Sequence, residues 1–146
     1  MFYKKYYKIT SPYGTRTLNG KVTNHEGIDI VGIDDKTILS PIDGIVQSST
    51  IINDTSNLTW QWGNYIRIDS ADGLRLFFCH LNNRSVKKGD KVIKGQPIGI
   101  EGNTGYSFGT HLHFEVRTSK NISVDPVEYM KKDNKIQGID VSQSKK

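Results

Sequence analysis

The sequence has a single cysteine, Cys79, and only four histidines in its 146 residues. One cysteine cannot form an internal disulfide, which excludes a disulfide-stabilised scaffold and a zinc site built from several thiolates. Only two methionines accompany 14 glycines, a composition that does not favour a helical bundle. The length provides room for one domain, because domains most often contain about 100–150 residues.

Long apolar runs are also missing. Lysines interrupt the apolar stretches of residues 1–8, so this segment lacks the apolar core of a secretory signal peptide. No segment approaches the ~18 apolar residues that a membrane-spanning helix needs. We therefore expect no membrane span, and either retention in the cytosol, release by a route that these residues do not encode (as for a phage lysin), or excision from a longer chain.

The charge is moderately positive, with 20 Lys and Arg against 15 Asp and Glu and a formal net charge of +5. Such an excess is typical of a solvated surface, or of a protein with an anionic partner such as nucleic acid, acidic lipid or a cell-wall polymer. The sequence contains no run of five or six basic residues. A nucleic-acid-binding arm is therefore not expected.

Short apolar segments alternate with Gly, Asn and Asp turns along most of the chain. Residues 37–46 predict a strand pair that turns at Asp43-Gly44, and residues 65–79 predict a hairpin that turns at Asp72-Gly73. Residues 111–116 predict a further strand, and Asp125 precedes a proline as the N-cap of a short helix. The sequence thus predicts a mostly β, antiparallel fold.

Two similar segments, residues 86–92 and 93–99, each combine a glycine turn with an apolar strand residue. This tandem resembles the barrel-sandwich hybrid that lipoyl and biotinyl carrier domains also use. A carrier needs a modifiable lysine at a hairpin tip between two symmetric halves. Lys91 follows a Gly-Asp turn instead, so the carrier interpretation is not favoured.

The histidines lie in short motifs that suit metal chemistry. His111, His113 and Glu115 alternate along one predicted strand and therefore share one face, opposite the apolar Leu112 and Phe114. Glu115 is placed to orient a histidine through its second ring nitrogen. A histidine pair of this kind can also belong to an ordinary surface, or to a cupin, but in a cupin the glutamate follows the second histidine at a greater distance.

A second motif, His25-x-x-x-Asp29, supplies another imidazole and a carboxylate, and His80 ends a predicted strand. Two histidines and one carboxylate with an open fourth position are typical of a catalytic zinc site. Zinc lowers the pKa of its bound water towards ~7, and a further imidazole can accept the proton. Cys79 directly precedes His80, so alternation points it to the opposite face, where we expect a buried apolar residue and not a ligand.

Taken in order, the motifs resemble peptidase family M23, the lysostaphin/LytM-type zinc endopeptidases that cut peptidoglycan peptides. The similar segments are Tyr13-Gly14-Thr15-Arg16, residues 25–30, residues 40–46, residues 63–66, Phe78-Cys79-His80-Leu81, residues 89–99, residues 102–105, residues 111–115 and residues 125–129. They cover residues 10–130. The resemblance implies that the antiparallel sheet has the barrel-sandwich hybrid core of this family.

The resemblance also implies a role for each histidine. His25, Asp29 and His113 would bind zinc, while His80 and His111 would polarise the attacking water, steady the oxyanion and pass the proton to the leaving amine. The implied function is a zinc-dependent endopeptidase acting on peptidoglycan. The alternative is a catalytically silent cell-wall binding or regulatory module, although such members typically lose metal ligands and this sequence retains all of them.

Aromatic residues are candidates for contact with the substrate. Trp60 and Trp62 lie in a predicted loop, where they either line the substrate groove or pack beneath the loop, and Tyr106 lies in the last glycine-rich segment. Phe78 stands where members of the family often carry Tyr, so a hydroxyl at that position is missing. Whether the enzyme cuts glycine cross-bridges or D-Ala–diamino acid links stays open, because specificity depends on loops.

The composition changes after residue 130. Residues 1–130 are expected to form the peptidase domain, with residues 131–146 as a basic linker or tail. The tail segment Gly138-Ile139-Asp140-Val141-Ser142 either matches by chance or resembles the first strand of GH25-type muramidases. The resemblance would imply the peptidase part of a phage-type lysin that is cut inside its next domain. Bacterial peptidoglycan is the expected partner, with anionic wall polymers as a second one, and the chain is expected to be a monomer acting at the cell wall.

Overall fold

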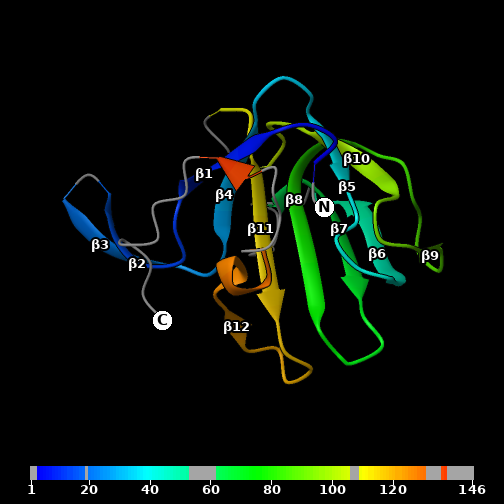
Figure 1. Ribbon diagram of the computed structural model, residues 1–146. Helices are drawn as coiled ribbons and strands as arrows, with labels where there is room; N and C mark the ends of the chain where they lie inside the picture. Colours follow the sequence, from blue (N-terminus) through cyan, green and yellow to red (C-terminus); the bar gives the residue numbers. More distant parts are fainter. Residues whose placement is uncertain (1–2, 19, 53–61, 106–108, 131–135, 138–146) are drawn as a thin grey trace.

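The computed structural model describes residues 3–18, 20–52, 62–105, 109–130 and 136–137. Their strands build one large sheet, with a separate two-stranded ribbon that projects from one side (Figure 1). The strands are β1 (Tyr7–Ser11), β2 (Gly14–Leu18), β3 (Lys21–His25), β4 (Ile28–Gly32), β5 (Thr37–Leu39), β6 (Gly44–Ile51), β7 (Asn64–Asp69), β8 (Arg75–Arg84), β9 (Lys91–Val92), β10 (Pro97–Glu101), β11 (Leu112–Arg117), β12 (Ser123–Val124) and β13 (Ile136–Gln137).

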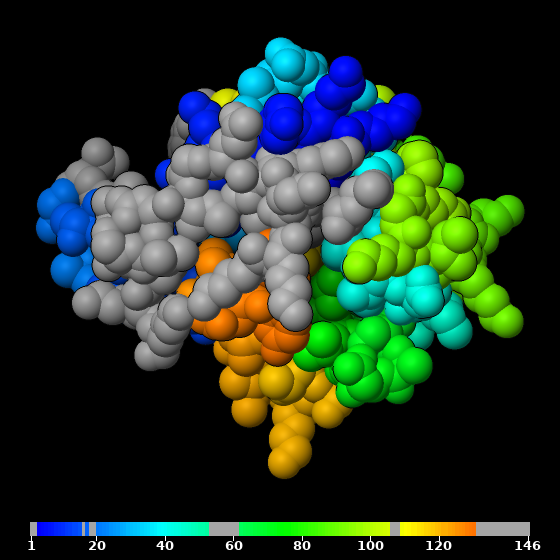
Figure 2. Space-filling view, in the orientation of Figure 1, coloured from blue at the N-terminus to red at the C-terminus, as the bar shows by residue number. Residues whose placement is uncertain are grey.

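The main sheet has the order β13-β1-β4-β11-β8-β7-β6-β9. β10 pairs with both β5 and β8, and β12 pairs with β11. Among the described strands, neighbours pair in the antiparallel sense apart from the parallel contact of β1 with β13. The prediction of a mostly antiparallel β fold is therefore confirmed. β2 and β3 form the projecting ribbon, which also stands out at the left of the space-filling view (Figure 2).

Period-two alternation places one face of the central strands in the core. In β11, Leu112, Phe114 and Val116 are buried in the main apolar cluster, and the ring centroids of Phe114 and Phe78 are 5.1 Å apart. In β4, Ile28 and Ile30 join the same cluster. On the opposite face these strands carry Asp29 and Val31 of β4 and His113, Glu115 and Arg117 of β11, because successive side chains alternate across the sheet.

The predicted hairpin of residues 65–79 is confirmed as β7 and β8, in which Asp69 pairs with Arg75 across a turn that contains Gly73 at φ 91°. The predicted strand pair within residues 37–46 is wrong, since β5 pairs with β10 while β6 pairs with β7 and β9. Gly44 does not serve a tight turn. It allows close approach of β7, because a Cβ there would lie 2.5 Å from the carbonyl oxygen of Asp69.

The predicted short helix is present as a 3-10 helix, η2 (Pro126–Tyr129), with Asp125 as N-cap accepting a hydrogen bond from the Val127 N–H. In the described part of the chain, no helix is long and apolar enough to cross a membrane. β13 adds two residues to the edge of the sheet beside β1. Residues 131–135 and 138–146 lie outside the described residues, so the domain boundary at residue 130 and the muramidase-like segment stay predictions.

Candidate metal centre

Asp29 and His113 meet because β4 and β11 are neighbouring strands. The two residues are direct partners in the antiparallel register, and Oδ1 of Asp29 lies 3.2 Å from Nδ1 of His113. Ile28 and Ile30, on either side of Asp29, are buried in the core. Burial of the apolar positions of β4 therefore directs the Asp29 carboxylate to the polar face.

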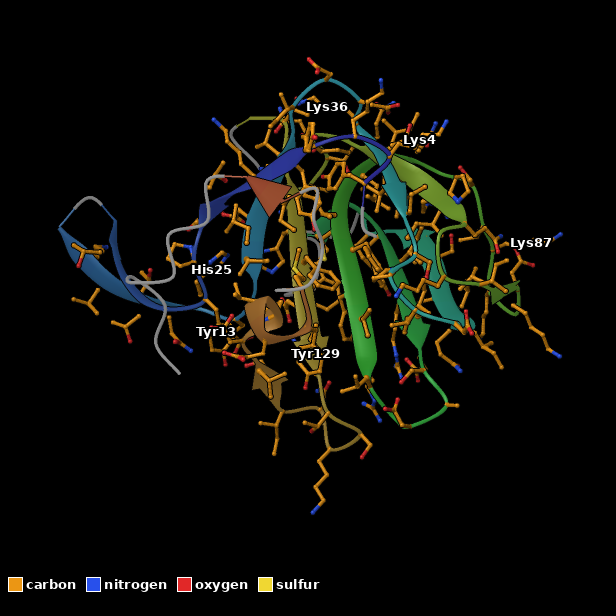
Figure 3. The ribbon with its side chains drawn as sticks, viewed as in Figure 1. Lys4, Tyr13, His25, Lys36, Lys87 and Tyr129 are labelled. Carbon is orange, nitrogen blue, oxygen red and sulfur yellow. The ribbon has the colours of Figure 1, made fainter. Side chains whose placement is uncertain are left out.

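His25 reaches the same point from the end of the β2–β3 ribbon. Its Nε2 lies 3.2 Å from Nδ1 of His113 and 3.3 Å from Oδ1 of Asp29. Gly27 permits this approach, because a Cβ at that position would lie 2.4 Å from the carbonyl oxygen of Phe114. Figure 3 shows His25 and Tyr13 on the side of the sheet from which the ribbon projects.

The three donor atoms form a nearly equilateral triangle with sides of 3.2, 3.2 and 3.3 Å. Ligands at about 2.0 Å from a tetrahedral zinc ion are separated by about 3.3 Å. Two imidazole nitrogens and one carboxylate oxygen are also the ligand set of many catalytic zinc sites. The residues His25, Asp29 and His113 thus fit one metal ion in spacing and in chemistry.

The electrostatics of this triangle favour a positive charge. Burial raises the pKa of Asp29, but hydrogen bonds to His113 and His25 outweigh it and hold the pKa well below its usual range. Burial lowers the pKa of His113, while its bonds to Asp29 and Glu115 reverse that effect and raise the pKa to about 9. In the absence of metal, the proton on His113 thus supplies the positive charge that a bound cation would otherwise supply at this point.

Glu115 and Arg117 hold the far side of the His113 ring. Nε2 of His113 lies 2.8 Å from Oε2 of Glu115, and this carboxylate accepts the ring proton. Arg117 donates from Nε and Nη2 to the other oxygen, Oε1, at 2.9 and 2.7 Å. Each carboxylate oxygen therefore has its own partner, and the His113 ring presents Nδ1 to the metal position.

His80 and His111 lie beside the triangle. Their ring centroids are 4.8 Å apart, and the His80 ring is 6.1 Å from that of His113. Nε2 of His111 lies 3.6 Å from Oδ1 of Asp29. Burial lowers the pKa of His80 to about 4, so this imidazole is neutral at neutral pH. The four histidines and the one aspartate that the sequence singled out are thus brought together.

Backbone carbonyls hold the other three histidine rings. Nδ1 of His25 bonds to the Pro12 oxygen, Nδ1 of His80 to that of Thr104, and Nδ1 of His111 to that of Gly109, at 2.8, 2.7 and 2.9 Å. A carbonyl only accepts, so each Nδ1 carries the proton. In the neutral form of each ring, Nε2 is then the nitrogen that carries the lone pair.

Cys79 does not point to the face opposite His80, contrary to the expectation from the sequence. Cys79 pairs with His113 in the β8–β11 register, which places both side chains on the same face. His80 has a left-handed backbone with φ 69°, and this breaks the strand alternation. The Cys79 side chain is fully buried, as expected, and burial raises the pKa of its thiol well above the usual range, so it stays protonated.

The aromatic candidates have different outcomes. Trp62 packs against Phe77 and Tyr65, with ring centroids 5.2 and 5.1 Å away, and the Arg117 guanidinium lies 5.9 Å from its ring. Trp62 therefore packs on strand residues near the site and remains partly exposed. Trp60 and Tyr106 lie outside the described residues. Phe78 is fully buried in the core, on the face away from the site.

Sequence reasoning missed two residues that hold the site. Arg117 lies two positions beyond Glu115 and four beyond His113 in β11, so period-two alternation contained the signal for it. Thr104 acts through its backbone carbonyl and its hydroxyl, and no local sequence pattern reports where a carbonyl oxygen points. The carbonyls of Pro12 and Gly109, which accept hydrogen bonds from His25 and His111, could not be predicted from the sequence for the same reason.

An antiparallel sheet domain that brings two imidazoles and a carboxylate within 3.3 Å of one another suits a metallopeptidase domain. The chain belongs to peptidase family M23, whose sequence profile matches residues 23–126. Among its relatives, the glycyl-glycine endopeptidase ALE-1 of Staphylococcus capitis is 35% identical over 129 residues, which cover 86% of this chain and 34% of that protein. The peptidoglycan DD-endopeptidase ShyA of Vibrio cholerae is 34% identical over 113 residues, which cover 75% of this chain and 25% of that protein.

The fold has a matching solved structure. The catalytic domain of the antimicrobial peptidase lysostaphin from Staphylococcus simulans superposes with a TM-score of 0.72 at 31% sequence identity, covering 86% of this chain and 92% of that domain. The chain spans about a third or less of the length of the two curated relatives. It therefore corresponds to one part of each relative and not to the whole protein.

Proposed function

We propose that this chain is a zinc-dependent endopeptidase domain that hydrolyses peptide bonds of bacterial peptidoglycan. The observation that carries the proposal is the triangle of His25, Asp29 and His113, whose donor atoms are 3.2–3.3 Å apart. Two imidazole nitrogens and one carboxylate oxygen at this spacing suit zinc better than calcium or magnesium, because both of those ions prefer six or more oxygen ligands. The family match and the names of the two relatives support the reaction class.

Each group would have a distinct role. His25, Asp29 and His113 would hold the ion, and bound zinc would supply Lewis-acid activation of a water and of the scissile carbonyl. His80 and His111, held through Nδ1–H, would direct their basic Nε2 atoms to the reacting groups. One imidazole would take the proton of the attacking water and return it to the leaving amine, and a protonated ring would donate a hydrogen bond to the oxyanion.

Glu115 would act through His113 and not on the substrate. By accepting the Nε2 proton it fixes the tautomer in which Nδ1 is the metal-binding nitrogen, and it increases the basicity of the ring. Arg117 keeps that carboxylate ionised and in place. Trp62 would line the margin of the substrate groove, and we propose the same role for Trp60 and Tyr106.

Two substrate bonds are consistent with the relatives. One is a glycyl-glycine bond of a cross-bridge, as in the name of ALE-1, and the other is a bond of the DD-endopeptidase type, as in the name of ShyA. We propose that the chain acts as a monomer at the bacterial cell wall. Exposed lysines around β9 would add attraction to anionic wall polymers: Lys87, Lys88, Lys91 and Lys94. Lys87 extends into solvent at the right of Figure 3.

The test is digestion of purified walls from two kinds of bacteria, one with glycine cross-bridges and one with direct D-Ala–diamino acid links. The zinc-loaded domain should release new free amines from at least one wall, and mass spectrometry of the fragments identifies the bond. His113→Ala and a chelator should each abolish the release. Binding of walls in a sedimentation assay without new amines would instead identify a catalytically silent module and overturn the proposal.

A further inference from the structure

His80 occupies an unusual backbone conformation at the end of a regular strand pairing. β8 pairs regularly with β11 as far as Cys79, and the next residue, His80, has φ 69°. Non-glycine residues rarely adopt this left-handed region, and it is not supported by the ladder of β11. The β7–β8 pairing shifts register between Ile66↔Phe78 and Asn64↔Leu81, so His80 lies in a bulge, and contacts from neighbouring segments help to hold it there.

Thr104 supplies the first of these contacts with its backbone. The His80 Nδ1 donates a hydrogen bond of 2.7 Å to the Thr104 carbonyl oxygen. This bond fixes both the ring orientation and the tautomer, because the oxygen can only accept. Displacement of the Thr104 carbonyl would free the ring to rotate and to move its proton between the two nitrogens.

The Thr104 side chain, in turn, fixes its own backbone. Its hydroxyl donates to the Leu81 carbonyl oxygen at 2.8 Å and accepts from the Asn64 N–H at 3.0 Å. One hydroxyl thus joins the segment that follows β10 to the strand of His80 and to the start of β7. Both hydrogen-bonding functions of the hydroxyl are used in this bridge.

Gly63 closes the bridge from the other side. It has φ 61°, and a Cβ there would lie 2.4 Å from the Gly105 nitrogen and 2.4 Å from the Thr104 carbonyl carbon. No larger residue fits between β7 and the Thr104 backbone without moving one of them. The close packing of Gly63 and the two hydroxyl bonds therefore define the position of the Thr104 carbonyl.

We propose that Thr104, seated against Gly63, is a positioning residue that sets the orientation and the tautomer of His80. This inference rests on the proposed function, in which His80 acts on the reacting groups. The three hydrogen bonds of Thr104 described above run to His80, Leu81 and Asn64, none of which is a candidate metal ligand. Its effect is transmitted through one carbonyl oxygen, and it acts on the proton-transfer step and not on the affinity for zinc.

The test compares Thr104→Val, which keeps the side-chain shape but removes both hydroxyl bonds, with Thr104→Ser, which retains the hydroxyl. In the zinc-loaded domain, Thr104→Val should lower kcat by about 10–100-fold with less than about a threefold change in KM or in zinc affinity. Thr104→Ser should retain most of the activity. Thr50→Val removes an exposed hydroxyl from β6 and serves as the matched control with unchanged activity.

A second measurement reads His80 without any substrate. In 15N NMR spectra of the zinc-loaded domain, with His80→Ala used for assignment, wild type and Thr104→Ser should show a proton on Nδ1 of His80. Thr104→Val and Gly63→Ala should show exchange between the two tautomers. If no wall is cleaved by the wild type, the proposed function fails while this spectrum still tests the positioning role.

Three results would overturn the inference. The first is an unchanged His80 spectrum and an unchanged kcat in a folded Thr104→Val variant. The second is equal loss of kcat in the Val and Ser variants, which would show that the hydroxyl is not the responsible group. The third is a parallel loss of zinc from Thr104→Val, because the bridge would then support the metal ligands and not His80 alone.

Discussion

His113 Nδ1 lies 3.2 Å from Asp29 Oδ1, although 84 positions separate the two residues in the chain. They are direct cross-strand partners of β11 and β4. The distance between two candidate ligands is thus set by the register of one strand pair. A slip of one residue would turn one of the two side chains towards the core, so burial of the apolar face also protects the site.

Substitution of the carboxylate tests the metal position. Asp29→Asn keeps the size of the side chain but removes the charge. It should weaken zinc binding by more than about 100-fold, which exceeds the loss expected for a residue that only hydrogen-bonds to a metal ligand. Competition with a chromophoric chelator measures this affinity. Asp34→Asn, at an exposed position just after β4, is the matched control. Equal affinities in the two variants would show that Asp29 is not a ligand.

The partner of the His113 ring should influence affinity more mildly. Glu115→Gln removes the charge that accepts the Nε2 proton, so zinc affinity should fall by about 10–100-fold with the fold intact. Arg117→Met should cause a smaller loss in the same direction, because the carboxylate remains but is no longer held. Glu128→Gln, on the exposed side of η2, should leave the affinity unchanged. The chelator assay would refute the Glu115 role if Glu115→Gln matched wild type.

The two histidines beside the triangle should separate binding from turnover. His80→Ala and His111→Ala should each retain zinc, because neither belongs to the triangle, and should each lower kcat by about 10²–10⁴-fold as general acid–base groups. His113→Ala should lose both zinc and activity. Metal content after dialysis and amine release from walls are the two measurements. Loss of zinc from His80→Ala would reassign His80 from catalysis to metal binding.

The buried hydroxyl of Tyr3, outside the candidate metal centre, should make the stability of the fold sensitive to alkaline pH. The Tyr3 hydroxyl donates to Oε1 of Glu101 at 2.7 Å, and burial together with that carboxylate raises the pKa of Tyr3 well above its usual value. The folded protein therefore holds this proton more tightly than the unfolded chain. The stabilisation is fully present below about pH 10 and is lost as the pH rises further, because the unfolded tyrosine ionises first.

Urea unfolding of wild type and Tyr3→Phe measures this effect. The difference in free energy of unfolding should be about 1.5–3 kcal/mol at pH 7, as for a hydrogen bond to a charged group, and should shrink above about pH 10. Tyr129→Phe, at an exposed position, should show a difference near zero throughout. A Tyr3 difference that stays constant up to about pH 11 would contradict the linkage.

Local patterns in the sequence contained much of the fold. Alternation predicted β7, β8 and β11, the Asp-Gly turn predicted the β7–β8 hairpin correctly, and Asp125-Pro126 predicted η2. The same reasoning failed at Asp43-Gly44, where the glycine serves a close contact with β7 and the neighbouring strand pairs with β10. In a sequence, an Asp-Gly pair that forms a hairpin turn looks the same as one whose glycine lets a neighbouring strand approach closely. The two cases differ only in which strands pair.

The sequence by itself determined the chemical inventory of this protein: the donor types, their spacing within each motif, and the strand face shared by His113 and Glu115. It did so because side-chain chemistry and period-two alternation are local properties. The tertiary structure alone decided three features. They are the 3.2–3.3 Å spacing of the three metal-donor atoms, the left-handed backbone of His80 at φ 69°, and the carbonyls that accept hydrogen bonds from three imidazoles. Those features depend on contacts between strands that are distant in the chain. Every residue has a backbone carbonyl oxygen, so the residue types in a sequence do not indicate which of these oxygens will accept a hydrogen bond from a histidine.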